Sequence, residues 1–359
     1  MTQSKIFKRM RPAGAGLLCL ISLLGQILSG CAAPSVRHTA EEQKDLVWPS
    51  PPERPRITYN RDIVFPRDIR RDSGVWDRIK ELITGKTLRE MVRPYGLTVD
   101  ADENLLIADP GAHVVHIYHL PDGRYRYLPQ RKDPVVLLSP IDLDVDVDGR
   151  IYVTDSAAGK VYIFNREGRY EKSLGDFLRP TGLAVNQTLR RVYVIDTQGQ
   201  SIRVYHTSGE HLFDFGGRGT GQKEFNYPTH ICLDQEGRVF VTDSMNFRVQ
   251  VFDPEGNFLQ VFGQAGDGPG SFSKPRGVGV DQEGHIYVAD ATFDNVQIFN
   301  SEGETLLYFG APGEESGKFY MPAGVAIDKG DRIFISDSFN RRIQVFQFLH
   351  EEEMPAPEE

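Results

Sequence analysis

Short hydrophobic runs recur along the chain from residue 94 to residue 348, and turns rich in Gly, Pro, Asn and Asp separate them. The runs are rich in Val, Ile, Tyr and Phe, which is typical of β-strands bounded by tight turns. No stretch with helical periodicity interrupts this series. We therefore expect four antiparallel strands in each repeated unit, as in the unit with runs at 231–233, 238–242, 249–252 and 258–262.

The strand pattern occurs six times, with a period of 40 to 48 residues. Every unit opens on a proline, at Pro94, Pro140, Pro180, Pro228, Pro275 and Pro322. The second predicted strand of every unit ends on an aspartate, at Asp109, Asp155, Asp196, Asp243, Asp290 and Asp337. This period, with four strands per unit, predicts an all-β, six-bladed β-propeller. Because the aspartates recur at one turn of every blade, we interpret them as structural residues that accept backbone N–H bonds.

The sixth unit supplies only three strands and ends at Ile343–Phe348. We expect the missing outer strand to come from residues 56–63, because that pairing would close the ring and remove two exposed sheet edges. Residues 72–85 predict one short amphipathic helix before the first blade, with Gly85 as its stop signal. We expect this helix to pack against one rim of the propeller rather than to dock a partner.

The last three units carry glycine-rich loops before their opening prolines. These loops begin at Gly216, Gly263 and Gly310, and each has a phenylalanine three residues before the proline, at Phe225, Phe272 and Phe319. The segments Asp243–Phe252 and Asp337–Phe346 are also closely alike. On these motifs residues 90–348 resemble the NHL-repeat family of β-propellers, which implies the same fold. Blades 1 to 3 have shorter loops without the glycine series, so the resemblance implies shared loop function only for blades 4 to 6.

The first thirty residues predict a targeting segment. A basic region that ends at Arg11 precedes an apolar stretch from Ala13 to Ile27, and Leu28-Ser-Gly-Cys31 matches the lipobox of bacterial lipoproteins. In that family the chain is cleaved before the cysteine and the thiol carries the lipid, so we expect lipidated Cys31. The alternatives are a transmembrane anchor, for which the stretch is short, and a chance cysteine after a signal peptide.

The chain then divides into four segments. We expect a signal peptide at 1–30, a proline-rich tether at 31–55, the propeller at 56–348 and an acidic, disordered tail at 349–359. The lipid on Cys31 predicts membrane attachment at a bacterial cell envelope. Ala32 favours the periplasmic side of the outer membrane, by the sorting rule known for some Gram-negative lipoproteins.

The charge and the cysteine content argue against a nucleic-acid partner and against a reactive thiol in the propeller. The chain has 41 Lys and Arg against 50 Asp and Glu, a formal net charge of −9, and loss of residues 1–30 removes four basic residues and no acidic one. An acidic, exported chain lacks the basic surface that nucleic-acid binding requires, so we expect no nucleic-acid partner. Cys232 would be the cysteine left in the propeller, and its place at a small-residue position of an innermost strand predicts a buried, inert thiol.

Four blades open with Pro-x-Gly, but the second opens with Pro140-Ile-Asp142 and the fourth with Pro228-Thr-His230. These positions lie near the mouth of the central channel, and neighbouring positions add Tyr95 and Arg276. We therefore predict that these polar side chains converge on one ligand pocket, at Tyr95, Asp142, His230 and Arg276. The alternative is that Asp142 and His230 cap local turns.

Asp142 and Asp144 are surplus to the repeat pattern and point to the same side of a predicted strand. Together with His230 they are weak candidates for a divalent cation, which requires several oxygen ligands. The spacing does not match an EF-hand loop, and a lone cysteine cannot build a thiolate site. We therefore predict no cofactor, with a divalent cation at Asp142, Asp144 and His230 as the alternative.

These observations favour a binding or scaffold module over an enzyme, because no nucleophile motif and no paired acid and base are evident. We expect a protein partner at the loops of blades 4 to 6. The alternative is an enzyme with its site at the channel mouth. Some NHL propellers are metal-dependent lyases with channel histidines, and other six-bladed propellers are metal-dependent lactonases, whereas His230 is the one channel histidine expected here.

Overall fold

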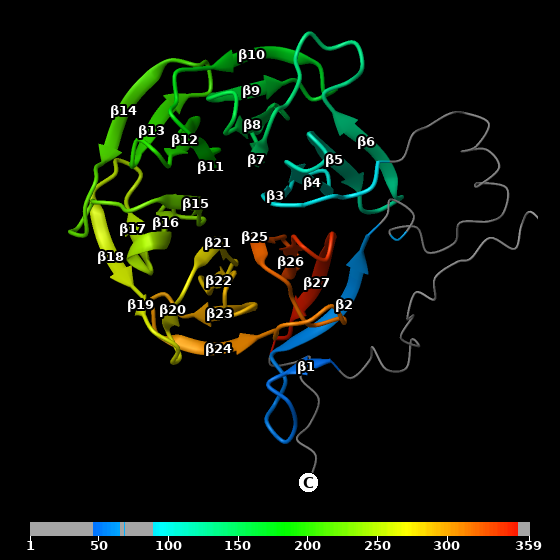
Figure 1. The fold of residues 1–359 in the computed structure, drawn as a ribbon, viewed down its shortest axis with the longest axis vertical. Helices are drawn as coiled ribbons and strands as arrows, with labels where there is room; N and C mark the ends of the chain where they lie inside the picture. Colours follow the sequence, from blue (N-terminus) through cyan, green and yellow to red (C-terminus); the bar gives the residue numbers. More distant parts are fainter. Residues whose placement is uncertain (1–45, 65–67, 69–88, 351–359) are drawn as a thin grey trace, which may run out of the picture. The chain divides into compact units, whose positions relative to one another are not determined.

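Six antiparallel sheets surround a common axis in the computed structural model, which describes residues 46–64, 68 and 89–350 (Figure 1). They confirm the six-bladed β-propeller, and we number the blades in chain order. Blade 1 contains β3 (Leu97–Val99), β4 (Asn104–Asp109), β5 (Val114–His119) and β6 (Arg124–Leu128). Blade 2 contains β7 (Pro140–Val145), β8 (Ile151–Asp155), β9 (Lys160–Phe164) and β10 (Tyr170–Leu174). Blade 3 contains β11 (Pro180–Asn186), β12 (Arg191–Asp196), β13 (Ser201–His206) and β14 (His211–Gly216). Blades 4 and 5 contain β15 (Pro228–Leu233), β16 (Val239–Asp243), β17 (Arg248–Phe252), β18 (Phe258–Phe262); and β21 (Pro275–Val280), β22 (Ile286–Asp290), β23 (Asn295–Phe299), β24 (Thr305–Phe309).

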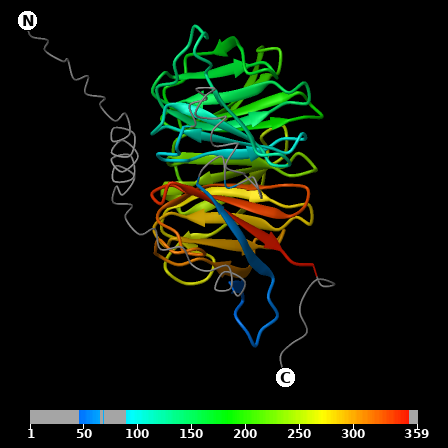
Figure 2. The same ribbon diagram turned by 90° about the vertical axis from the view of Figure 1, so that its right-hand side faces the viewer.

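Blade 6 combines both ends of the described chain. It contains β25 (Pro322–Ile327), β26 (Arg332–Asp337) and β27 (Arg342–Phe348), followed outward by β2 (Ile57–Ile63) and β1 (Val47–Trp48). β2 is antiparallel to β27, with Ile57 opposite Phe348 and Ile63 opposite Ile343. Figure 2 shows this blue strand running beside the red one. β1 lies inside the segment 31–55, which the sequence predicts as a tether, so the end of that segment belongs to blade 6 instead. Trp48 holds it there by packing on Phe309 and Phe346, with ring centroids 5.9 and 5.7 Å apart.

Several expected segments lie outside the described residues. These are the signal peptide at 1–30, most of the tether, the whole of the helix expected at 72–85, and the tail from residue 351 onward. In the part of the chain that the structure describes, no helix is long and apolar enough to span a membrane. Beyond the blades, the structure has a one-turn 3-10 helix at Ser244–Asn246 and a short parallel pair, β19 (Gln264–Ala265) and β20 (Ser271–Phe272).

Hydrophobic side chains from neighbouring blades form the core. Phe225, Phe272 and Phe319 are fully buried beneath the glycine-rich loops of blades 4 to 6, where burial of each ring stabilises the fold by about 2–3 kcal/mol. The glycines that begin these loops have φ between +89° and +100°, and a Cβ on any of them would lie 2.4–2.6 Å from the ring. Glycine is therefore required where the backbone passes over the phenylalanine.

The six repeated aspartates are confirmed as structural. Asp109 accepts hydrogen bonds from the backbone N–H groups of Val92 and Arg93 before the opening proline, and from Gly111 and Ala112 in the following turn. All six are buried, and the other five accept equivalent backbone bonds from the connection before their own blade. Each carboxylate therefore fastens the incoming loop to its blade.

The strand connections divide between two faces. The loops between blades and the turns between second and third strands lie on one face, which we call the loop face and which faces the viewer in Figure 1. The turns between first and second strands, and between third and fourth strands, lie on the opposite turn face. Acidic residues outnumber basic ones in the turns of the turn face. Five first turns begin with an aspartate, at Asp100, Asp146, Asp234, Asp281 and Asp328.

Candidate functional site

The six innermost strands β3, β7, β11, β15, β21 and β25 contact one another in sequence around the central channel. The second residue after the opening proline lies where these strands approach most closely. Glycine occupies this position in four blades, and a Cβ on Gly277 would lie 2.2 Å from the carbonyl oxygen of Ala323 in the next blade. Asp142 and His230 are the two exceptions, and both side chains are buried along the channel.

Asp142 and His230 approach each other across blade 3. Asp142 Oδ2 lies 3.6 Å from His230 Nε2, and the same oxygen accepts a 3.0 Å hydrogen bond from the backbone N–H of Leu183. His230 Nδ1 accepts a 3.4 Å bond from the N–H of Val278. Because Nδ1 is an acceptor, the neutral ring carries its proton on Nε2, directed toward Asp142. Nε2 is buried and makes no hydrogen bond in the described structure.

Burial controls the protonation of these groups, because an uncompensated charge is costly away from water. It raises the pKa of Asp142 to about 8 and that of Asp144 to about 7. It lowers the pKa of His230 to about 4. At neutral pH Asp142 is therefore mainly protonated and His230 is uncharged, which agrees with its role as an acceptor at Nδ1.

Asp144 lies two residues after Asp142 on β7 and lines the same channel cavity. Its Oδ2 accepts a 2.8 Å bond from the N–H of Val185, while Oδ1 accepts bonds from the N–H of Val145 and the hydroxyl of Thr98. Asp142 and Asp144 thus join β7 to β11 through Leu183 and Val185. This arrangement explains both surplus aspartates as links between neighbouring blades.

A divalent cation requires several converging ligands. Among the described residues, no three His, Cys, Asp or Glu side chains are grouped so that they could hold a metal ion. Asp142 and Asp144 already accept backbone N–H groups, and His230 adds a single nitrogen. The channel residues described here therefore do not fit a cation site.

Tyr95 and Arg276 form a separate pair on the loop face. The guanidinium carbon of Arg276 lies 5.6 Å from the ring centroid of Tyr95, within the range of a cation–π contact. Neither residue lines the cavity that holds Asp142 and His230. The structure thus resolves the four residues of the predicted pocket into two pairs.

The channel cavity has a volume of about 180 Å³ and also contains Cys232. Cys232 is half-buried rather than fully buried, and its surroundings raise the pKa of the thiol well above its ordinary value, so the thiol is protonated at neutral pH. Val185, Leu233, Val280 and Ile327 line both this cavity and a larger one of about 800 Å³ on the turn face. A third cavity, of about 590 Å³, shares Asp144 and Ile327 with the channel.

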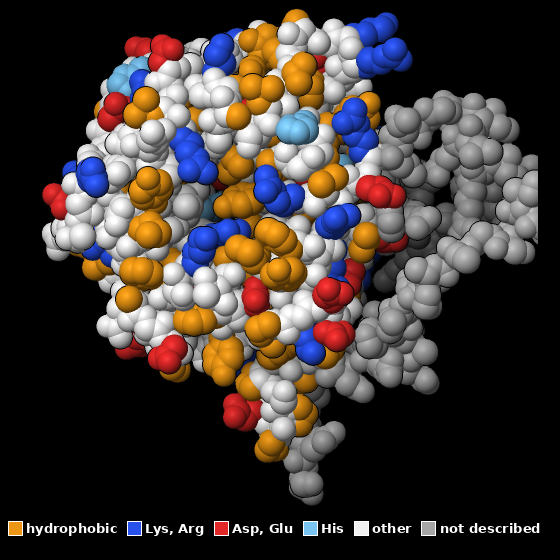
Figure 3. Space-filling view, viewed as in Figure 1, with side chains coloured by type: hydrophobic (Ala, Val, Ile, Leu, Met, Phe, Trp, Pro, Cys, Tyr) orange, Lys and Arg blue, Asp and Glu red, His pale blue; other side chains and the backbone are white. Residues whose placement is uncertain are grey.

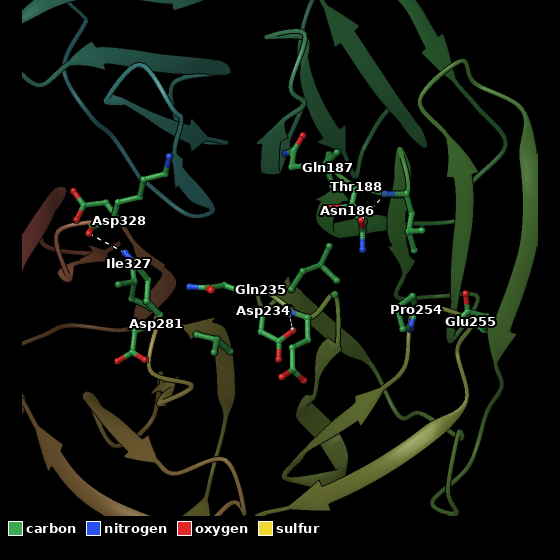
Figure 4. A pocket seen from close by; sticks show the side chains of 18 residues that line it. Asn186, Gln187, Thr188, Asp234, Gln235, Pro254, Glu255, Asp281, Ile327 and Asp328 are labelled. Carbon is green, nitrogen blue, oxygen red and sulfur yellow. Dashed lines mark hydrogen bonds between the residues drawn. The ribbon is translucent and has the colours of Figure 1, made fainter.

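We call these three adjoining cavities the turn-face funnel. Figure 4 shows the largest of them, with Asn186, Gln187 and Gln235 across from Asp281 and Asp328. Sequence reasoning missed the funnel, although the chain carried a signal for it. Glutamine occupies the second position of the first turn in three successive blades, at Gln187, Gln235 and Gln282.

The aspartates that begin the turns around the funnel are engaged within those turns, whereas Glu236 and Glu255 of its wall pair with Arg238 and Arg191, at 3.5 and 3.1 Å. Asp234 Oδ1 accepts the N–H groups of Glu236 and Arg238, and its Oδ2 bonds the Arg238 guanidinium at 2.6 Å. Asp281 and Asp328 accept the equivalent backbone bonds in blades 5 and 6. Gln187 and Gln282 donate their side-chain amides to the carbonyls of Val145 and Lys329, at 2.7 and 2.8 Å. Hydrogen bonding to a ligand therefore falls mainly to Gln235, whose amide has no hydrogen bond among the described residues.

Comparison of the sequence with family models identifies the family of this chain. Residues 76–265 match the family described as SMP-30/Gluconolactonase/LRE-like region, and this match covers more than half of the chain. The chain belongs to this family. Two further segments, 272–299 and 319–346, match the NHL repeat, so the resemblance in the last two blades is confirmed. No curated protein sequence matches the chain.

Solved structures with similar folds have low sequence identity. Virginiamycin B lyase from Staphylococcus aureus is 15% identical, with a TM-score of 0.53 over 72% of this chain and 96% of that one. Proteins described as auxiliary nutrient binding proteins come from Bacteroides thetaiotaomicron and Bacteroides ovatus. They are 16% and 14% identical, with TM-scores of 0.59 and 0.58 over 72% of this chain and 70% of each of theirs. These likenesses establish the fold.

Proposed function

We propose that this protein is a non-enzymatic binding module, held at a bacterial cell envelope by a lipid on Cys31. The observation that carries the binding role is the turn-face funnel, whose wall offers amide and hydroxyl groups around a cavity of about 800 Å³. A concave site of this size, with a few polar groups over an apolar floor, suits ligand capture. The floor is formed by Val185, Leu233, Val280 and Ile327.

The funnel favours an uncharged ligand rich in hydrogen-bonding groups, such as a sugar chain or a peptide segment. An amide side chain both donates and accepts, so it suits hydroxyl or peptide groups. The nearby aspartates are engaged in their own turns and the nearby glutamates pair with arginines, so they offer less to a cationic ligand. Similar folds in proteins described as auxiliary nutrient binding proteins support a capture role.

Calorimetric titration with neutral oligosaccharides and uncharged peptides tests this proposal. We expect saturable binding to one of these probes, weakened about ten-fold by Gln235→Ala through loss of ligand hydrogen bonds. Gln222→Ala is the matched control, because Gln222 is an exposed glutamine on the loop face. No binding by any probe, or equal loss in both variants, would refute ligand capture in the funnel.

A protein partner at the loops of blades 4 to 6 is the second part of the proposal. Parallel bridges inside these loops, such as Arg218 to Phe225 and Pro312 to Phe319, brace them over buried phenylalanines. A braced loop loses little conformational entropy on binding. Crosslinking from residues 218, 267 and 314 in the intact envelope should capture a protein. Capture that persists when crosslinkers are moved to the turn face would argue against these loops.

An enzyme resembling metal-dependent lyases or lactonases is the second candidate function. The observation that favours it is the buried Nε2 of His230, which has no hydrogen-bond acceptor and faces Asp142 at 3.6 Å. Such a pair can hold or exchange one proton. The channel residues do not fit a cation site, however, so we place this function second.

A further inference from the structure

Three successive blades carry an exposed aliphatic side chain at the same place on the loop face. Val92, Leu138 and Leu178 each lie two residues before the opening proline and are 45%, 52% and 65% exposed. Their positions are equivalent, because the backbone N–H of each donates to the repeated aspartate of its blade, at 2.7, 2.6 and 2.9 Å. Val136 in the same loop as Leu138 is 69% exposed.

The fold does not require an apolar residue at this position. Blades 4 and 5 have Asn226 and Ser273 there, and the backbone N–H of each makes the same bond, at 2.7 Å. Blade 6, the other neighbour of blade 1, has Tyr320, which is 49% exposed and makes the bond at 2.8 Å. Single exposed hydrophobic residues are common on protein surfaces, but recurrence at one position of three adjacent blades is a pattern. The side chains are therefore available to contact a surface outside the propeller.

Basic residues accompany the aliphatic ones. Arg93 and Arg179 directly follow Val92 and Leu178 and are exposed, and Arg131 and Lys132 lie in the loop before Val136. Figure 3 shows hydrophobic and basic side chains intermingled on this face, including the part over β7–β10. The opposite turn face is rich in carboxylates. The chain is acidic as a whole, so this local excess of positive charge is a specific feature of the surface.

We propose that the loop face of blades 1 to 3 docks directly on an anionic lipid bilayer. We call the surface formed by Val92, Arg93, Leu138, Leu178 and Arg179 the docking surface. Aliphatic side chains that enter the headgroup region, surrounded by Arg and Lys, are the chemistry of proteins that bind membranes peripherally. Equivalent positions of a propeller lie at one height along its axis, so the three aliphatic groups can meet a flat surface together.

Docking in this way would orient the molecule. With the loop face of blades 1 to 3 on the bilayer, the turn-face funnel points away from the membrane. A bound lipid on Cys31 would raise the effective concentration of the docking surface at the bilayer, so weak docking is sufficient. Docking does not require that lipid, so it can be measured on a chain without one.

The test uses a chain without residues 1–30 and with Cys31→Ser, so that neither the apolar segment nor a lipid contributes. The change lies outside residues 46–350, which contain all the described strands. The chain is sedimented with vesicles of phosphatidylethanolamine and phosphatidylglycerol, or of phosphatidylcholine alone. We expect binding only to the anionic vesicles, with a loss as salt increases. Arg93→Glu with Arg179→Glu should weaken that binding at least about ten-fold.

A second variant tests the aliphatic contribution. Val92→Ser, Leu138→Ser and Leu178→Ser together should reduce vesicle binding by a similar factor. Its control is Leu259→Ser with Leu306→Ser, because both leucines are 50% exposed on outer strands. Arg169→Glu with Arg190→Glu is the charge control on the turn face, and unfolding curves verify that all variants fold.

Two results would overturn the proposal. One is equal binding to anionic and neutral vesicles, or none to either. The other is vesicle binding that survives the docking-surface variants. If the same variants instead abolish a protein crosslink in intact envelopes while vesicles never bind, the surface serves a protein partner.

Discussion

The carboxylate of Asp142 and the imidazole of His230 lie 3.6 Å apart, although they belong to the second and fourth blades. Both side chains occupy positions where the other blades have glycine, and both reach backbone N–H groups of the following blade. The pair is buried, so its protonation affects stability as well as any chemistry in the channel.

Asp142 should make the protein less stable as the pH rises. Its pKa is about 8 in the folded chain and near its ordinary value of 3.8 in the unfolded chain. The folded state therefore binds more protons between these values, and this stabilisation is fully present below pH 3.8 and is lost as the pH rises through about 8. Asp142→Asn should reduce the fall in unfolding free energy between pH 6.5 and 8 by about 1–2 kcal/mol.

Urea unfolding at several pH values measures this change. The window begins at pH 6.5, because His230 has a lowered pKa and its contribution of opposite sign is lost only below that value. The exposed carboxylate of Asp148 is the control, and Asp148→Asn should keep the slope of the unchanged protein. Identical slopes for Asp142→Asn and the unchanged protein would show that Asp142 is already ionised when folded.

The metal content of the purified protein distinguishes the proposed binding function from the alternative enzymatic function. We expect the purified protein to retain no stoichiometric divalent cation, because Asp142 and Asp144 already accept backbone N–H groups. Elemental analysis by mass spectrometry checks this on the unchanged protein and on His230→Ala. One equivalent of metal per chain, released by His230→Ala or by Asp142→Asn with Asp144→Asn, would place the enzyme first.

Deletion of β2 should expose the edge of β27. Ile57 and Ile63 are fully buried, and their loss with the strand should cause aggregation or a large drop in thermal stability. Removal of residues 32–45 should have little effect. Trp48→Ala should cost about 2 kcal/mol, because the indole packs on Phe309 and Phe346. Equal melting temperatures for the two deletions would contradict a stabilising role of β2.

Lipidation of Cys31 predicts membrane partition of the mature protein. Expressed in a Gram-negative host, the unchanged chain should fractionate with membranes, and mass spectrometry should find its N-terminus at a lipidated Cys31. Cys31→Ser should prevent lipidation and leave only the weaker vesicle binding of the docking surface. A soluble, unlipidated product from the unchanged gene would refute the anchor.

The repeat pattern was sufficient for much of the fold. Alternating short strands and turn residues predicted six blades, and the recurrence of Asp109 and its equivalents predicted their structural role. These inferences succeed because a repeated residue faces a repeated environment. The sequence also identified Asp142 and His230 as departures from the repeat, and it predicted that both lie near the mouth of the central channel.

Only the tertiary structure determines which contacts Asp142 and His230 make. Whether Asp142, His230, Tyr95 and Arg276 meet depends on the height and rotation of each blade, and the sequence pattern within one blade does not contain that information. The structure separates Tyr95 and Arg276 from Asp142 and His230, and it places Asp144 against the N–H of Val185 in the next blade.

The funnel and the docking surface each combine residues from several blades, so they exist only in the closed propeller. Gln187 and Gln235 are ordinary turn residues in sequence, and Leu138 and Leu178 are ordinary loop residues. The periodic sequence determined that each would occupy an equivalent place in its blade. Only closure of six blades around one axis brought these places together on opposite faces, because contacts between blades join residues some 40 or more positions apart.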